Sequence, residues 1–337
     1  MSGRLDLRRG VVVSADPLVV EVDGARRRAW ADEALLGEMR EGDEVIVNAA
    51  ALDLGLGSGG FDVVHVNLTR GLGGGVEGDA HVMKLNYTSL QHPVEPVEGE
   101  QPLPGNGNST RRPLSVPVVV LPLHGHLAPA AWAASQARPG IRVGYVQTGG
   151  GALPGSLSRD VAALRERGLL AGHVTAAPSY GGEREALSTV GALDAAATAL
   201  GWDAILVGPG PGIIGSDTEY GHGGMEALAG AHAALSLGLP TIVSPRLSSA
   251  DPRDRHRGLS HHTATVLELL LAPVTVALPE GAPGIDASRH RVERVAVDLE
   301  PYAASGLPTT TMGRSLADDP LFFEAPLAAG AFVASPA

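Results

Sequence analysis

Two short stretches of this sequence carry residues that could bind a metal ion. His124 and His126 flank one glycine at the end of an apolar run, and a glycine-rich loop over residues 208–224 carries Asp217 and His222. Residues two apart in an extended strand point to the same side, so both imidazoles could reach one ion. Imidazole suits zinc and neighbouring divalent metals. The candidate metal ligands are His124, His126, Asp217 and His222, with carbonyl capping and solvated turn residues as the alternative.

Positive charge concentrates between residues 246 and 257 of a chain that is otherwise acidic. Guanidinium groups bind carboxylate and phosphate through two parallel hydrogen bonds, so this stretch predicts an anion-binding site. Internal pairing with Asp251 and Asp254 is the alternative, although exposed pairs contribute little stability. The candidate anion-binding arginines are Arg246, Arg253, Arg255 and Arg257.

Two adjacent histidines follow Ser260, which we expect to cap a helix over residues 261–271. The positive end of a helix disfavours imidazolium, so His261 and His262 should be neutral near pH 7 and could act as acid, base or metal ligand. Adjacent helical positions diverge by about 100°, so we expect only one of the two rings to face the site. The candidate catalytic residues are His261, His262 and Asp217.

Glycine-rich turns offer backbone N–H groups that could bind an anion. Such turns occur over residues 148–151 and 208–215, where GPGIIG matches the dinucleotide pattern weakly. No acidic residue follows the next apolar run to bind a ribose, so a nicotinamide or flavin cofactor is disfavoured. Close packing of loops is the alternative role for these glycines. The candidates are Gly149, Gly150, Gly151, Gly210 and Gly212.

Lys84 is the only lysine, since every other basic side chain apart from histidine is arginine. A compact ammonium has properties that a guanidinium cannot reproduce, so a functional role is one interpretation. A surface lysine beside the strand-like HVMKLNY is the default interpretation.

Six continuous apolar runs after residue 114 predict strands buried on both faces: VPVVVLPL, IRVGYVQT, GHVTAAP, DAILVGPG, PTIVSPR and APVTVALP. They alternate with helices expected over 158–167, 183–200, 223–237 and 261–271. This alternation predicts a doubly wound α/β domain with a mostly parallel sheet of about six strands. Six strands also disfavour an eight-stranded amidohydrolase-like barrel. Ligands bind such a sheet beyond the carboxyl ends of its strands, where all the candidate loops lie.

The domain organisation follows from changes in pattern along the chain. Short alternating runs with Asp-Pro and Asp-Gly breakers predict a small β-rich domain over residues 1–92. A Pro- and Gly-rich linker over 93–113 separates it from the α/β domain over 114–290. A strand (RVERVAVDL) and an apolar helix around 316–334 should pack back from the tail over 291–337.

Composition excludes several classes of protein. The 337 residues carry a formal net charge of −12, which argues against nucleic-acid binding because that depends on Lys and Arg neutralising phosphates. Without cysteine there are no disulfides, thiol nucleophiles or thiolate metal sites. We find no apolar run long enough to cross a membrane and no signal peptide, so we expect a cytoplasmic protein with no membrane partner.

Four segments carry a resemblance to a known family: HVMKLNYTSLQ, TGGGALPGSLSRDVAAL, GPGPGIIGSDTEYG and SPRLSSADPRDRHRGLSHHT. Through them the chain resembles uncharacterised bacterial proteins labelled domain of unknown function 3866. The resemblance covers nearly the whole chain and implies no activity.

These residues together predict an α/β enzyme acting on a small anionic substrate, phosphorylated or carboxylated, by metal-assisted hydrolysis or group transfer. A divalent metal ion is the expected cofactor. The alternative is a ligand-sensing module that binds a phosphorylated metabolite in the same crevice without turnover. A third interpretation is an assembly protein that forms a homo-oligomer through its β domain.

Overall fold

The chain divides into two compact units, residues 1–93 and 94–337. The computed structural model describes residues 4–57, 59–73, 80, 82–100 and 115–334. Of the linker expected over 93–113, residues 101–113 lie outside the described residues. Its first part contains a 3-10 helix, η1 (Val97–Glu100), and the buried Val97 belongs to the core of the second unit.

The first unit is a small closed barrel, which confirms the expected β-rich N-terminal domain. Its strands run in the order β1-β2-β3-β5-β4 around a core of Val, Met and partly buried Leu and Ala side chains. The strands are β1 (Leu7–Ala15), β2 (Leu18–Val22), β3 (Ala25–Trp30), β4 (Glu44–Asn48) and β5 (Asp62–Asn67), with short helices α1 (Glu33–Leu36) and α2 (Ala50–Asp53).

A two-stranded sheet follows the barrel, formed by β6 (Val82–Lys84) and β7 (His92–Val94). Lys84 ends β6 with only 3% of its surface exposed. The expectation of a surface lysine is therefore wrong.

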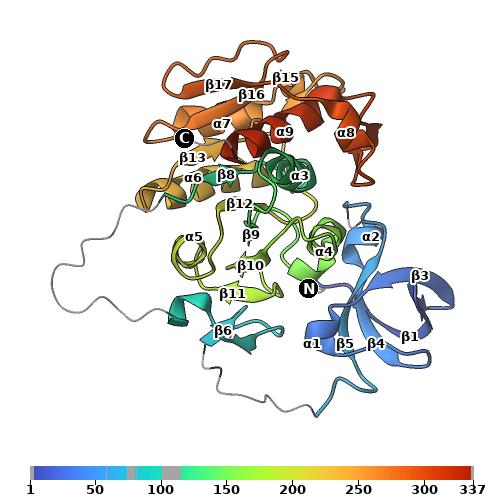
Figure 1. Ribbon diagram of the computed structural model, residues 1–337. Helices are drawn as coiled ribbons and strands as arrows, with labels where there is room; N and C mark the ends of the chain where they lie inside the picture. Colours follow the sequence, from blue (N-terminus) through green and yellow to red (C-terminus); the bar gives the residue numbers. More distant parts are fainter. Residues whose placement is uncertain (1–3, 58, 74–79, 81, 101–114, 335–337) are drawn as a thin grey trace. The chain divides into compact units, whose positions relative to one another are not determined.

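The second unit contains eight parallel strands in one open sheet, in the order β11-β10-β9-β12-β8-β13-β16-β17 (Figure 1). The α/β class and parallel sheet are confirmed, but the count of six strands is too low. The strands are β8 (Val118–Val120), β9 (Val143–Thr148), β10 (Gly172–Ala176), β11 (Arg184–Ala186), β12 (Ala204–Pro209), β13 (Thr241–Val243), β16 (Thr275–Pro279) and β17 (Arg291–Val295).

The two additional strands lie at the edges of the sheet. β11 occupies residues that we expected to begin a helix at 183, and that helix, α5 (Thr189–Thr198), starts after the N-cap Ser188. β17 is the strand expected in the C-terminal tail, and it pairs in parallel with β16. The side chains of β17 are exposed or half-buried, and β11 has only one buried residue, Ala186, so both strands lack the apolar run by which the six inner strands were found.

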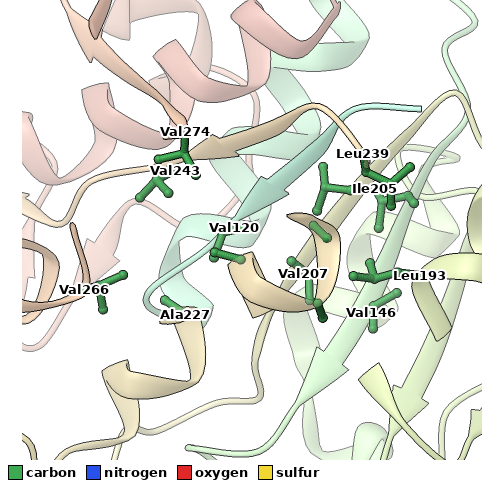
Figure 2. Close-up of a cluster of buried hydrophobic side chains, with 14 of the residues drawn as sticks. Val120, Val146, Leu193, Ile205, Val207, Ala227, Leu239, Val243, Val266 and Val274 are labelled. Atoms are coloured by element: carbon green, nitrogen blue, oxygen red, sulfur yellow. The ribbon is translucent and has the colours of Figure 1, made fainter. Parts of the chain in front are cut away.

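Helices cover both faces of this sheet, as its alternating side chains require. On β12, Ile205 and Val207 enter one hydrophobic core, while Ala204 and Leu206 enter the other. The first core packs against α5, α6 (Glu226–Ser236) and α7 (His261–Leu269), and Figure 2 shows its valine and leucine side chains. The second core packs against α3 (Leu127–Ala137), α4 (Arg159–Glu166), α8 (Leu299–Ala303) and α9 (Pro320–Ala334).

Helix α3 is an element that the sequence pattern did not predict. Residues 124–129 were expected to form a loop, but they contain a 3-10 turn, η2 (His124–His126), and the first residues of α3. α3 lies beside α9, which covers it (Figure 1). Because α3 is buried among apolar neighbours, its alanine-rich sequence shows no polar stripe to mark a helix.

The remaining short elements lie in the loops at the carboxyl ends of the strands and in the tail. They are η3 (Gly155–Leu157), η4 (Gly223–Met225), β14 (Leu247–Ser248), η5 (Asp254–His256), β15 (Gly258–Leu259), β18 (Thr310–Thr311) and β19 (Arg314–Ser315). β14 pairs with β15 and β18 with β19, each antiparallel.

Candidate functional site

The turns that follow the central strands contact one another at the carboxyl edge of the sheet. His124, after β8, contacts the carbonyl of Pro209 at the end of β12. His126 contacts Ser244, which follows β13. Arg255, further along the β13 loop, donates to Asp217 in the β12 loop at 2.6 Å. The loops chosen from the sequence therefore gather at one edge, as expected for a doubly wound sheet.

His124 is a buried histidine with a partner for each ring nitrogen. Its Nδ1 lies 3.1 Å from the Pro209 carbonyl oxygen, and its Nε2 lies 2.7 Å from Ser158 Oγ. Ser158 also caps α4 by accepting the N–H of Val161. Burial lowers the pKa of His124 and outweighs the opposing charge of Asp160. These contacts match the carbonyl-capping alternative.

His126 points to the other side of β8. Its Nδ1 lies 3.0 Å from Ser244 Oγ, and its ring meets Phe322 edge-on at 5.0 Å. The residue has no exposed surface, and within the described chain its Nε2 has no hydrogen-bond partner. Burial, together with the charge of Arg246, lowers the pKa of His126 to about 3.

The two imidazoles after β8 therefore do not face one metal ion. The chain leaves the extended conformation after the strand and forms the 3-10 turn η2, so the alternation expected for a strand does not continue. His124 turns toward β12 and His126 toward β13, the two strands that flank β8. The prediction that both rings point to one side is wrong.

The glycine turns pack against each other closely. A Cβ on Gly151 would lie 2.2 Å from the carbonyl oxygen of Gly210, so only glycine fits there. Gly150 adopts a φ of 90° and lies against Gly223, while Gly149 lies against Pro178 and Gly212 adopts a φ of 68°. These contacts match the packing alternative, and anion binding by the five glycines stays a prediction.

Three histidines from two elements come together at this edge. His222 precedes η4, and His261 and His262 form the first turn of α7, which Ser260 caps as predicted by accepting the N–H of His262. One ring nitrogen from each of His222, His261 and His262 lies within 4.8 Å of the others. The rings of His261 and His262 are 4.4 Å apart. The expectation that only one of these two rings faces the site is wrong, because both rings contribute a nitrogen to the same group.

Two buried nitrogens of this cluster lack a hydrogen-bond partner among the described residues. His222 Nε2 lies 3.0 Å from the Glu219 carbonyl, whereas its Nδ1 is buried without a hydrogen bond to any described residue. The same holds for His261 Nε2. A Cβ on Gly224 would lie 2.9 Å from His222 Nδ1 and 3.2 Å from His262 Nδ1, so both atoms approach the same glycine.

The surroundings of the cluster favour the neutral form of its three imidazoles. Burial is the largest cause that lowers the pKa of His222 and His261, and it lowers that of His262 to about 2, with further lowering by neighbouring histidines and Arg246. The direction of these pKa shifts agrees with the predicted neutrality, with burial as the principal cause. Neutral imidazole is the form that binds metal ions.

His256 joins the cluster and was missed in the sequence. Its ring centre lies 4.9 Å from that of His261 and 4.8 Å from that of His262. Its Nδ1 lies 2.7 Å from Ser260 Oγ, and burial followed by the charge of Arg246 lowers its pKa to about 3. His256 lies within the arginine-rich run, which was interpreted only as an anion-binding stretch. Its position six residues before His262 could have indicated a fourth histidine of the cluster.

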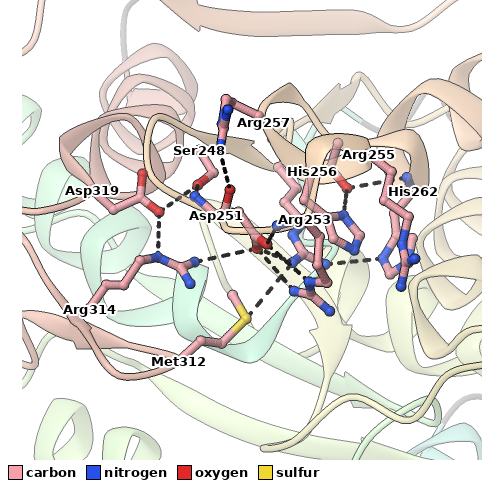
Figure 3. Close-up of polar contacts among 12 residues, drawn as sticks. Ser248, Asp251, Arg253, Arg255, His256, Arg257, His262, Met312, Arg314 and Asp319 are labelled. Carbon is pink, nitrogen blue, oxygen red and sulfur yellow. Dashed lines mark hydrogen bonds and ion pairs between the residues drawn. The ribbon is translucent and has the colours of Figure 1, made fainter.

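The four candidate arginines have different environments, and Figure 3 labels three of them, Arg253, Arg255 and Arg257. Arg253 forms a two-point pair with Asp251, with both N···O distances 3.0 Å. Arg255 and Arg257 pair with the exposed carboxylates of Asp217 and Asp254. Arg246 is 2% exposed, and its Nη1 lies 3.2 Å from His262 Nδ1. All four thus have an internal carboxylate partner, at 3.4 Å for Arg246 and Asp251, and of the four only Arg246 also reaches the histidines by hydrogen bonding.

Asp217 lies apart from the histidine cluster. Its side chain is 87% exposed and contacts Arg255. The group of three residues placed for metal binding in the described structure contains His222 but not Asp217, His124 or His126. The geometry therefore groups one of the four predicted ligands with the two predicted catalytic histidines.

Comparison with known proteins places the chain in a family. The profile of a family described as Protein of unknown function (DUF3866) matches residues 28–330, which include part of the first unit, most of the second unit and all the loops above. The chain belongs to this family. The family's description assigns no activity to its members.

Other comparisons add no function. No curated protein matches the chain. No solved structure matches it either. Of the helices in the described ranges, none has the length and apolar character needed to span a membrane.

Proposed function

We propose that the chain is a metal-dependent enzyme that catalyses hydrolysis or group transfer on a small anionic substrate, with the metal held by His222, His261 and His262. The observation that carries this proposal is the convergence of three imidazole nitrogens within 4.8 Å, two of the rings having a buried nitrogen without a described partner. Buried polar atoms normally have a partner, so such atoms concentrated in one place point to a ligand.

The contacts around His222 favour metal binding over a purely structural role. The Glu219 carbonyl can accept the Nε2 proton of His222, which leaves the Nδ1 lone pair free. Metal-binding histidines commonly use one nitrogen for a carbonyl or carboxylate and the other for the ion. His124 shows the contrasting structural arrangement, in which both ring nitrogens have protein partners.

Three imidazole ligands suit zinc or a related divalent metal, which leaves a further position for water or substrate. A metal bound in this way would activate water for attack on a carbonyl or phosphoryl group. The role of this chain's residues would be to keep three imidazoles neutral, with His222 and His262 buried and His261 half-buried. His256, held by Ser260, packs beside two of them and limits their movement.

Metal content and turnover test the proposal directly. We expect purified protein to contain about one equivalent of zinc or a similar metal, measured by mass spectrometry after dialysis against metal-free buffer. Hydrolysis of a panel of phosphate and carboxylic esters should disappear with chelation and in His222→Ala. His232→Ala, on helix α6, is the matched control because His232 contacts the N–H of Leu271 instead.

Two results would remove parts of the proposal. If the purified protein binds no divalent metal even when metal is added, the proposed metal site is wrong. Protein that binds metal and anionic ligands but turns over no substrate supports the ligand-sensing alternative instead of an enzyme.

A further inference from the structure

We propose that Arg246 forms a buried subsite that binds one oxyanion group, phosphate or carboxylate, beside the histidine cluster. This inference adds a specific substrate-binding residue to the proposed function. Anion binding by Arg246 can be tested alone, but its role in catalysis rests on the proposed function. The wider expectation of a clamp formed by four arginines is thereby reduced to one. Arg253 and Arg255 have carboxylate partners at 3.0 and 2.6 Å, and Arg257 has an exposed side chain that solvent can hydrate.

Arg246 is a buried cation whose contacts are all long or weak. Its Nη2 lies 3.4 Å from Asp251 Oδ2 and 3.8 Å from the sulfur of Met312, and its Nη1 lies 3.2 Å from a neutral imidazole nitrogen of His262. Its Nε has no partner in the described part of the chain. Charge-assisted hydrogen bonds of arginine are normally about 2.7–2.9 Å long. A guanidinium that is 2% exposed therefore lacks a strong acceptor.

The nearest carboxylate is already engaged. Asp251 accepts two side-chain hydrogen bonds and one backbone hydrogen bond from Arg253, each 3.0 Å long. Burial alone would raise the pKa of Asp251, but these bonds and the charge of Arg246 lower it overall. Asp251 is therefore a shared anion that interacts mainly with Arg253.

A third guanidinium comes from the C-terminal tail (Figure 3). Arg314 pairs with Asp319 at 3.0 Å and lies 3.6 Å from Asp251, and its buried Nη2 makes no hydrogen bond to a described residue. Three arginines thus share two buried carboxylates, Asp251 and Asp319. Three guanidinium groups and two carboxylates give the group a net charge of +1, which favours binding an anion.

The backbone of Arg246 is fixed relative to the histidines. Its N–H donates to Thr263 Oγ1, and its carbonyl accepts the N–H of Ser260. Both partners belong to the start of α7, which carries His261 and His262. An oxyanion on Arg246 would thus lie next to the proposed metal ligands, where a hydrolytic enzyme needs the charged group of its substrate.

Met312 covers part of this subsite. It lies at the tip of the β18–β19 hairpin in a left-handed conformation (φ 45°) and is 48% exposed, while its sulfur contacts Arg246. A thioether is a weak acceptor, and an oxyanion is a strong one. Binding would replace the sulfur at the guanidinium, so the side chain of Met312 would move aside.

The test measures anion binding to the full chain by calorimetry after treatment with a chelator, using inorganic phosphate and, separately, succinate. We expect the native protein to bind at least one of them, and the tighter of the two identifies the chemical class. Arg246→Gln should weaken binding by at least about tenfold, as expected for loss of a charged hydrogen-bonding group. Arg138→Gln is the matched control, because Arg138 pairs with Asp203 at the end of α3.

A second variant keeps the test decisive if Arg246→Gln does not fold. Arg246→Lys retains the charge without the planar fork and should weaken binding at least about threefold. Native protein that binds neither anion, with or without added zinc, overturns the inference. Equal affinity in native protein and in a folded Arg246 variant also overturns it.

The outcomes for the metal and for the anion can be separated. Anion binding that depends on Arg246 and persists in His222→Ala supports the subsite even if no metal is ever bound. Metal binding by the histidines without any contribution from Arg246 to anion affinity leaves the proposed function in place and removes only this inference.

Discussion

Histidines at the same edge of the sheet, His124 on the one hand and His222 and His261 on the other, differ in what their ring nitrogens contact. His124 has Ser158 on one nitrogen and the Pro209 carbonyl on the other. His222 and His261 each keep one buried nitrogen without a partner among the described residues. The difference shows that a histidine in a loop at the carboxyl edge is not by itself a metal ligand. The hydrogen bonds available to its two nitrogens separate these cases only together with its neighbours, because His126 also has a buried Nε2 without a described partner but packs against Phe322 and lies outside the group of three histidines.

Zinc binding should produce the largest contrast between the two sets. Saturating zinc should stabilise the native protein by about 3 kcal/mol at a hundredfold excess over the dissociation constant. For a unit of this size we expect a melting temperature about 5–10 °C higher, measured by calorimetry. His222→Ala and His261→Ala should abolish the shift, and Ser158→Ala should retain it. A shift that survives in both histidine variants would contradict the comparison.

Without metal, Ser158→Ala should lower the free energy of unfolding more than His261→Ala, the reverse of their effects on zinc binding. Ser158→Ala removes both a helix cap and the partner of His124 Nε2, so it should cost about 1–3 kcal/mol in free energy of unfolding. His261→Ala removes a ring whose Nε2 has no described partner, so it should cost less than about 1 kcal/mol. Urea unfolding of chelator-treated protein measures both values. A larger loss in His261→Ala would show that His261 is structural.

Acid should destabilise the protein through its buried neutral imidazoles. His126 has a pKa near 6.5 when unfolded and about 3 when folded, mainly because of burial. Above pH 6.5 the ring is neutral in both states and contributes no pH dependence. As the pH falls from 6.5 toward 3, only the unfolded state binds the proton, so the free energy of unfolding decreases.

The slope that His126 contributes between pH 6 and 4 should be about 1.4 kcal/mol per pH unit. His126→Gln should remove that part of the slope, measured from urea unfolding at a series of pH values. An unchanged slope would mean that His126 becomes protonated in the folded protein.

The smallest effect is expected at the exposed pair of Asp217 and Arg255. With the Asp217 side chain 87% exposed, Asp217→Asn should change stability by less than about 1 kcal/mol and leave zinc affinity unchanged. Isothermal titration with zinc tests this. A marked loss of zinc affinity would return Asp217 to the set of metal ligands predicted from the sequence.

Much of the α/β unit could be predicted because its signals are local. Inner strands appear as continuous apolar runs, and Ser158 and Ser260 cap their helices as their positions indicate. The edge strand β11 and the buried helix α3 could not be found in this way. The first has no apolar run, and the second has no polar face.

The sequence located the loops that form the candidate site. Which residues of those loops belong to the site depends on side-chain directions, and the spacing of residues in the sequence does not determine these. His124 and His126 diverge because the chain turns after β8, and His261 and His262 lie with their ring centres 4.4 Å apart although adjacent helical positions diverge. Pairing of Arg253 with Asp251 was visible as an alternative. The weak contacts of Arg246 depend on Met312 and His262, which are remote in sequence and unpredictable from it.

X-ray absorption at the zinc edge of protein loaded with one equivalent of zinc tests the central claim most directly. The account predicts about three imidazole nitrogens at 2.0–2.1 Å. In His222→Ala one of these nitrogens should be lost, while His124→Ala should leave the spectrum unchanged. A spectrum without histidine scattering, or one altered by His124→Ala and not by His222→Ala, would contradict it.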